Sequence, residues 1–171
     1  MSELNRRDFL RLCAVTSMGL VIGIPIAGRS ASSESELHPL IKIDSKGRVT
    51  IYAQNPEMGQ GVKTALPMMI AEELDVDWAS IEVEQADWDS RLQNQFSGGS
   101  LSVRLNYNAM RQAGASARAM LLAAAANQLK CSVAELDTGS GHVISRSSNT
   151  RLSYAELAEA AAVLPVPDKP E

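Results

Sequence analysis

The segment that decides the fold is SVRLNYNAMRQAGASARAMLLAAAANQLK, residues 102–130. Along it, small and apolar side chains recur at the spacing of one helical face. They are Met110, Ala113, Ala117, Met120, Leu121 and Ala124. The pattern predicts a single long helix, and its many alanines would let the backbone approach its neighbours closely. We therefore expect this helix to lie close to a sheet.

Short strands precede and follow this helix. Residues 40–44 and 48–53 alternate apolar with polar side chains around a turn that contains Gly47, which predicts a β-hairpin with one covered face. Residues 81–84 alternate in the same way and predict a third strand. A further short strand is expected at residues 142–145, after a Gly-Ser-Gly turn.

Two shorter helices complete the pattern. Residues 62–74 separate apolar from acidic side chains at helical spacing, although Pro67 should be tolerated there only near the first turn or at a kink. Ser153 followed by Glu156 is a capping box, so the last helix should run from there to about Val163. The polar residues 87–96 are expected to form a loop.

The composition is that of a folded domain. The chain has 171 residues, of which 45% are hydrophobic, and a net charge of -4; these values exclude a disordered chain and a basic nucleic-acid binder. The order of elements predicts an α/β (α+β) fold, a small layered domain of short strands packed against one long Ala-rich helix and two shorter helices. Two cysteines cannot support a disulfide framework.

The N-terminal residues differ from the rest and indicate an export signal. Asn5 to Arg11 form a charged cluster, and residues 12–27 follow without a charge. This apolar run is shorter than the roughly 20 residues that span a bilayer. Paired arginines followed by Phe-Leu resemble the twin-arginine signal, which predicts a periplasmic protein; a retained membrane anchor is the alternative. Ser30 to Glu36 are expected to form a linker.

The first candidate binding loop is NPEMGQG, residues 55–61, between a strand and a helix. Gly59 and Gly61 allow a positive φ and the close approach of a ligand to bare main chain. The helix start that follows should direct free N–H groups at a ligand. Gln60 adds an amide that suits the edge of a heterocycle. The alternative is a tight turn that binds nothing.

The second candidate loop is FSGGSLS, residues 96–102, again directly before a helix. It offers two glycines and three hydroxyls, and Arg104 lies one turn from Ser100, where it could meet a phosphate in bidentate fashion. The alternative is that Ser100 or Ser102 caps the helix. Together, the two loops predict a joint site for a polar, phosphate-bearing ligand.

The remaining polar residues give no further site. Arg111 and Arg118 are expected on a solvated helix face, and His38 and His142 lack partners at metal-ligand spacing. Cys131 is most simply a buried small hydrophobe. Acidic helix faces and N-terminal turns account for five carboxylates, so none is singled out as a general base. These are Glu57, Glu72, Glu73, Asp75 and Asp77.

The two loops resemble cofactor-binding motifs of the xanthine dehydrogenase and aldehyde oxidase family. Residues 57–61, EMGQG, with Thr64 are similar to one molybdopterin-binding motif of that family. Residues 97–104, SGGSLSVR, with Asn106 and Ala109 are similar to the next cofactor loop. The twin-arginine signal and AEEL at 71–74 with Trp78 point to the isoquinoline 1-oxidoreductase β-subunit branch.

This resemblance implies a molybdenum hydroxylase large subunit, which hydroxylates an N-heterocycle or aldehyde with water as the oxygen source. It implies molybdenum held by a molybdopterin cytosine dinucleotide, and 2Fe-2S clusters only in a partner subunit. Glycine N–H groups of the second loop would approach the metal's ligands, and its serines would bind phosphates or the pterin. The implied cofactor-binding residues are Gly59, Gln60, Gly61, Ser97, Gly98, Gly99, Ser100, Ser102 and Arg104.

The chain also departs from the family's pattern. The family's general base is a Glu in a Gly-rich motif far downstream, and no such motif occurs here, so no catalytic or metal-ligating residue is predicted and the isolated chain is expected to be inactive. We expect a signal and linker at 1–35, a partial molybdopterin-binding domain at 36–163, part of a larger fold, and a Pro-rich linker at 164–171.

The expected partners are the remainder of the large subunit, a small iron–sulfur subunit and the twin-arginine translocon, with no nucleic acid. Two other hypotheses remain open from the sequence. One is an exported, non-enzymatic module that binds an anion, and the other is an inactive gene fragment.

Overall fold

A computed structural model of the chain describes residues 34–167 and residue 170. Internal contacts divide the chain into two units, Met1–Ser32 and Ser33–Glu171. All of the described residues belong to the second unit, which is described here by itself. The predicted export signal and residues 168, 169 and 171 of the Pro-rich segment lie outside the described residues.

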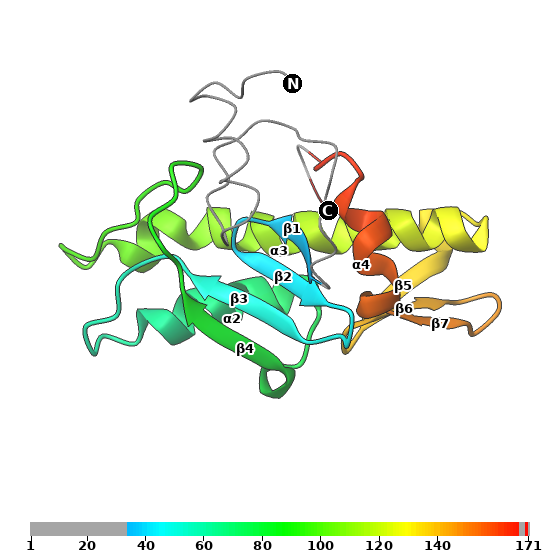
Figure 1. Cartoon of the computed structure of the whole chain (residues 1–171), viewed down its shortest axis with the longest axis horizontal. Coiled ribbons are helices and arrows are strands. Elements are labelled where there is room, and N and C mark those ends of the chain that lie inside the picture. Colours follow the sequence, from blue (N-terminus) through cyan, green and yellow to red (C-terminus); the bar gives the residue numbers. More distant parts are fainter. Residues whose placement is uncertain (1–33, 168–169, 171) are drawn as a thin grey trace, which may run out of the picture. The chain divides into compact units, whose positions relative to one another are not determined.

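A four-stranded sheet forms the front layer of this unit (Figure 1). Its strands, in spatial order, are β1 (Glu34–His38), β2 (Ile41–Asp44), β3 (Val49–Ala53) and β4 (Ile81–Gln85). The predicted hairpin is confirmed, since β2 and β3 are antiparallel with Ile43 opposite Val49. The predicted third strand is β4, which pairs with β3 in parallel.

Strand β1 corrects the sequence prediction. The segment up to Glu36 was expected to be a linker, but residues 34–38 pair with β2, with Glu34 opposite Asp44. Linker residues of this kind show no alternation of apolar side chains. Pairing with an available strand edge needs only backbone N–H and C=O groups, so the side-chain pattern does not reveal it.

A second, three-stranded sheet lies next to α4. Its strands are β5 (Leu136–Gly139), β6 (His142–Ser145) and β7 (Arg151–Ser153), in that order. Only β6 was predicted. Strands β5 (LDTG) and β7 (RLS) show no clear alternation, because each contributes only one buried apolar residue, Leu136 and Leu152. The turn between β5 and β6 is a two-residue hairpin loop in which both residues have a positive φ.

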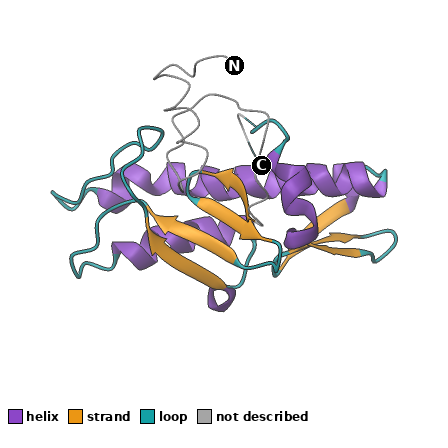
Figure 2. Cartoon of the chain, in the orientation of Figure 1, coloured by secondary structure: helices purple, strands orange, loops and turns teal. Residues whose placement is uncertain are grey.

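Three helices pack on these sheets, as Figure 2 shows. They are α2 (Val62–Leu74), α3 (Ser102–Leu129) and α4 (Tyr154–Ala162), with the short 3-10 helices η1 (Trp78–Ser80) and η2 (Val133–Glu135). The predicted α+β class is confirmed. Pro67 was expected near the first turn or at a kink. It lies in the second turn of α2, and the helix continues through it. The Pro67 ring is buried, and Pro67 supplies no N–H to the helix.

The predicted buried face of α3 is confirmed, but its closest neighbour differs from the prediction. α3 packs most extensively on α2 rather than on a sheet. At Gly114 the approach is so close that an added Cβ would lie 2.6 Å from the carbonyl oxygen of Ile70 and 2.8 Å from Cβ of Glu73. The small side chains of α3 thus serve a helix-to-helix contact.

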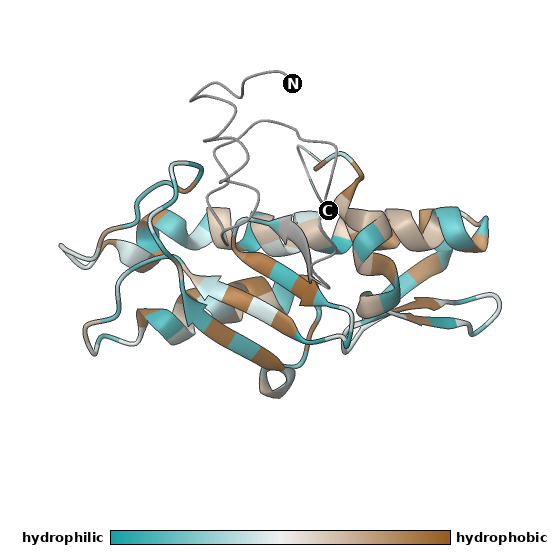
Figure 3. Ribbon diagram, in the orientation of Figure 1, coloured by the Kyte–Doolittle hydropathy of each residue, from teal (hydrophilic) through white to brown (hydrophobic). Residues whose placement is uncertain are grey.

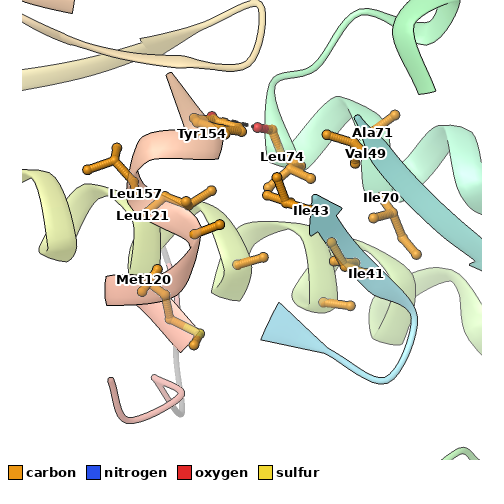
Figure 4. Packing of buried hydrophobic residues seen from close by; sticks show 14 of the residues in the cluster. Ile41, Ile43, Val49, Ile70, Ala71, Leu74, Met120, Leu121, Tyr154 and Leu157 are labelled. Carbon is orange, nitrogen blue, oxygen red and sulfur yellow. Dashed lines mark hydrogen bonds between the residues drawn. The ribbon is translucent and has the colours of Figure 1, made fainter. Parts of the chain in front are cut away.

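One core connects the helices and sheets (Figure 4). Leu66, Ile70 and Leu74 of α2 are fully buried between the sheet and α3. Tyr154, the first residue of α4, connects that helix to the end of α2, because its hydroxyl donates to the carbonyl oxygen of Leu74 at 2.8 Å. Burial raises the pKa of Tyr154, so this hydroxyl stays protonated and remains a donor. Figure 3 shows the alternation of apolar and polar residues along β2 to β4 that this packing requires.

The capping box of α4 gives a first testable prediction. Ser153 Oγ accepts from Glu156 N at 3.3 Å, and Glu156 Oε2 accepts from Ser153 N at 2.7 Å. Ser153→Ala should lower the free energy of unfolding by about 1 kcal/mol, measured by urea denaturation. Ser132→Ala is the matched control, since Ser132 forms the same box on the short helix η2. Because α4 packs in the core, the loss of stability should be larger for Ser153→Ala than for Ser132→Ala. Equal losses in the two variants would contradict this expectation.

Candidate functional site

The two candidate loops lie side by side. Figure 1 shows the segments that precede α2 and α3 at the same end of the unit. Ser97 Oγ donates to the carbonyl oxygen of Pro56 at 2.7 Å, and Gln60 Nε2 lies 3.3 Å from the same hydroxyl. The structure therefore joins residues 41 and 37 positions apart in a single exposed surface, as a joint site requires.

Three buried amide side chains lie beneath this surface. Gln54, Asn55 and Asn106 are 3%, 0% and 1% exposed. Gln54 Nε2 donates to Asn106 Oδ1 at 2.9 Å, and Asn106 Nδ2 donates to Asn55 Oδ1 at 3.1 Å. We call these three residues the amide cluster. It connects the end of β3 to the first turns of α3.

The amide cluster also fixes the second loop. Asn55 Nδ2 donates to the carbonyl oxygens of Asn94 and Phe96, at 2.8 and 2.6 Å, and Gln54 Nε2 donates to that of Gln93. These side chains satisfy backbone groups that an irregular loop leaves without partners. The sequence prediction missed the roles of Gln54 and Asn55. The sequence signal that could have revealed these roles is a pair of amide residues directly after a buried strand.

Glu57 organises the first loop. Its carboxylate accepts the backbone N–H groups of Gly59, Gly61 and Lys63 at 2.6, 3.0 and 2.9 Å. These bonds, that from Lys63 most strongly, hold the pKa of Glu57 below its ordinary value. The expectation that the start of α2 presents free N–H groups to a ligand is therefore wrong for Gly61 and Lys63, because Glu57 occupies them. The expectation that turns account for this carboxylate is confirmed.

Gln60 is held inside the same loop. Its Oε1 accepts Met58 N at 2.6 Å, and its Nε2 donates to the carbonyl oxygen of Pro56 at 2.9 Å. Gly59 and Gly61 have φ values of 95° and 79°, as predicted. No atom lies within 4 Å of the place where a Cβ would stand at either glycine, so bare main chain faces outward.

The second loop ends in a tight turn. Gly99 and Ser100 have φ values of 59° and 55°, and Leu101 N donates to the carbonyl oxygen of Gly98 at 3.1 Å. The alternative that Ser100 or Ser102 caps α3 is wrong, because Leu101 is the N-cap residue and no side chain caps the helix. A capping serine needs extended backbone, which the left-handed Ser100 lacks.

Arg104 is exposed in the first turn of α3, close to this turn. Farther along the helix, Arg111 pairs with Glu73 at 2.5 Å, which raises the pKa of Arg111 and agrees with the predicted surface role. His38 Nδ1 accepts Leu40 N at 3.2 Å, and Cys131 packs partly buried against the core. Among the described residues, no group of three His, Cys, Asp or Glu side chains could hold a metal ion.

The donor set fits a polar organic anion. The uncapped start of α3, the hydroxyls of Ser100 and Ser102, and the Arg104 guanidinium can all donate to phosphate oxygens. The exposed glycines leave room for a flat ring system. Within residues 34–167, no helix is long and apolar enough to cross a membrane.

Comparisons with known proteins agree with this chemistry. A family model described as the molybdopterin cofactor-binding domain matches residues 5–170. The isoquinoline 1-oxidoreductase subunit beta of Brevundimonas diminuta is 31% identical over 175 residues, which cover 94% of this chain and 22% of that protein. A membrane-bound aldehyde dehydrogenase (pyrroloquinoline-quinone) of Gluconacetobacter polyoxogenes is also 31% identical, over 82% of this chain and 20% of that protein. The chain thus spans about a fifth of the length of these relatives.

A solved structure shows the same fold. A crystal structure of a Cu,Mo-CO dehydrogenase in its carbon monoxide reduced state superposes with a TM-score of 0.58 and 24% sequence identity. The match covers 70% of this chain and 15% of that one.

Proposed function

Because the chain belongs to the molybdopterin cofactor-binding domain family, we propose that its two joined loops form part of the cofactor-binding wall in the large subunit of a molybdenum hydroxylase. The observation that carries this proposal is the contact of Ser97 with Pro56 and Gln60, which brings both loops to one surface. The bound molybdenum cofactor would supply the redox chemistry, and the residues of this chain would bind and orient it.

The two loops offer different environments to such a cofactor. At the first loop, the Glu57 charge offsets the partial positive charge, about half an electron, of the start of α2. The second loop keeps its uncapped helix start and gains the Arg104 cation. We therefore place the phosphates near Ser100, Ser102 and Arg104, and the ring system along the bare main chain of Gly59 and Gly61.

The substrate class and the partners extend this proposal to the whole protein. We propose oxidative hydroxylation of an N-heterocycle or aldehyde with water as the oxygen source, with a cytosine dinucleotide form of the cofactor. The isoquinoline and aldehyde in the names of the two relatives support the two substrate classes. The greater length of these relatives supports further segments of the large subunit. The first relative is named as a subunit, which supports a partner that would carry the 2Fe-2S clusters.

We also propose export to the periplasm by the twin-arginine route. The charged cluster with Arg6 and Arg7, followed by the uncharged residues 12–27, supports it. This route exports folded proteins, so a cofactor could be inserted before export.

Gly98 provides the sharpest test of the cofactor site. Its φ is not positive, and an added Cβ would meet only the Phe96 ring at 3.8 Å, so Gly98→Ala should fold normally. If the cofactor approaches this main chain closely, the added methyl group should lower the molybdenum content per chain severalfold. The measurement is elemental analysis and pterin fluorescence of chains purified from a molybdate-fed host.

The control for this test is Gly139→Ala in β5. There too the φ is not positive and the added Cβ would make an ordinary contact, 3.7 Å from Ile144 Cδ1. It should leave the molybdenum content unchanged. A wild-type chain without molybdenum or pterin, even with the downstream polypeptide co-expressed, would refute the proposed function. Binding of pyrophosphate by such a chain would favour the non-enzymatic anion-binding module.

A further inference from the structure

The Glu57 carboxylate bonds to the backbone on both sides of Gln60. Its Oε1 accepts N–H groups of both Gly59 and Gly61, and its Oε2 accepts that of Lys63 in the first turn of α2. Two glycines with a positive φ are otherwise free to adopt many conformations. The carboxylate therefore selects one conformation of this loop.

The selected conformation extends to the second loop. Gln60 lies between the two held glycines, and its amide nitrogen donates to the Pro56 carbonyl oxygen. The Ser97 hydroxyl donates to the same oxygen and contacts the same amide. The Pro56 carbonyl is thus a shared acceptor for one side chain from each loop, and its position depends on the loop that Glu57 closes.

We infer that Glu57 is a positioning residue of the cofactor site: its carboxylate holds the first loop in shape, and that loop holds Ser97 and thereby the second loop. The inference rests on the proposed function only for the identity of the ligand. Glu57 itself acts through the two loops and is assigned no contact with the cofactor.

The test uses the full chain with three variants. Glu57→Gln keeps the size of the side chain but replaces one acceptor oxygen with a donor. Glu57→Asp keeps the charge on a shorter side chain. Glu72→Gln is the control, because Glu72 is an exposed carboxylate of α2 outside both loops. Two quantities are measured: hydrogen exchange of loop amides, and the loss of molybdenum during repeated gel filtration of chains from a molybdate-fed host.

Glu57→Gln should speed amide exchange by about tenfold or more at Gly59 and Gly61, as expected for lost charge-assisted hydrogen bonds. It should also speed exchange at Leu101 N–H, in the turn of the second loop. The initial molybdenum content of folded chains should stay near that of the wild type, while its loss becomes severalfold faster. Glu57→Asp should restore part of both properties, and Glu72→Gln should change neither.

Faster exchange confined to the first loop, with an unchanged rate of molybdenum loss, would overturn the inference and leave Glu57 as a local cap. If Glu57→Gln fails to fold, Glu57→Asp decides by the same two measurements. A wild type that never binds molybdenum would refute the proposed function alone, because the exchange at Leu101 still decides whether Glu57 couples the loops.

Discussion

Asn106→Leu is expected to lower the free energy of unfolding by about 2–6 kcal/mol. It leaves one N–H of the Gln54 amide and the amide oxygen of Asn55 buried without a partner, at about 1–3 kcal/mol each, while the other N–H of Gln54 keeps the Gln93 carbonyl. Leucine has the branched shape of asparagine and is not smaller, so a cavity does not explain the loss. The cluster also holds the carbonyl groups of Gln93, Asn94 and Phe96, so its loss should loosen the second loop, and the bonded Leu101 N–H in that loop should exchange faster in the folded variant. Urea denaturation measures the first effect and hydrogen exchange the second.

Asn108→Leu is the control for this prediction. Asn108 is exposed and lies on the same helix, so the identical substitution there should change the stability by about 0.5 kcal/mol or less. Equal effects of the two substitutions would contradict the role given to the amide cluster. A stabilised Asn106→Leu variant would do so more strongly.

Gly114→Ala should destabilise the protein although alanine is the better helix former. The intrinsic preference favours alanine by about 1 kcal/mol in an exposed helix. Here the added Cβ would lie 2.6 Å from a carbonyl oxygen of α2, an obstacle in the backbone that cannot rotate away. Overpacking costs about 1–3 kcal/mol and occasionally more, and we expect the upper end of this range. Because α2 and α3 carry the two loops at their starts, the molybdenum content should fall as well.

Asn127→Ala on the exposed face of α3 is the control for Gly114→Ala. It should follow the intrinsic preference and raise the stability by a few tenths of a kcal/mol, as judged from urea midpoints. A higher free energy of unfolding in both variants would show that α2 and α3 can move apart at no cost in stability.

Local signals made much of the fold predictable. The β2–β3 hairpin, the three helices and the capping box at Ser153 each depend on residues close together in the sequence. Strands β1, β5 and β7 depend on pairing partners instead. The predicted serine cap of α3 was wrong for a similar reason, because the left-handed backbone of Ser100 is set by the turn that folds around it.

The candidate site was predictable in part. The glycine bends and their closeness follow from loop chemistry and the family resemblance, while the roles of the individual cofactor-binding residues stay predictions. The amide cluster joins Gln54 to a residue 52 positions away, and no spacing rule indicates such a pair. The carboxylate of Glu57 was visible in the sequence, but its three donors depend on how the loop folds.

The contact at Gly114 has a consequence for protein engineering. Apart from Ser116, residues 113–117 are glycine and alanine, which have no rotamers, so this part of the contact adapts poorly to a bulkier neighbour by rearranging side chains. Insertions should therefore cost little in the mostly exposed segment 87–92, whereas bulkier substitutions are poorly tolerated in this stretch of the helix. A directed-evolution library should vary the former and leave the latter unmutated.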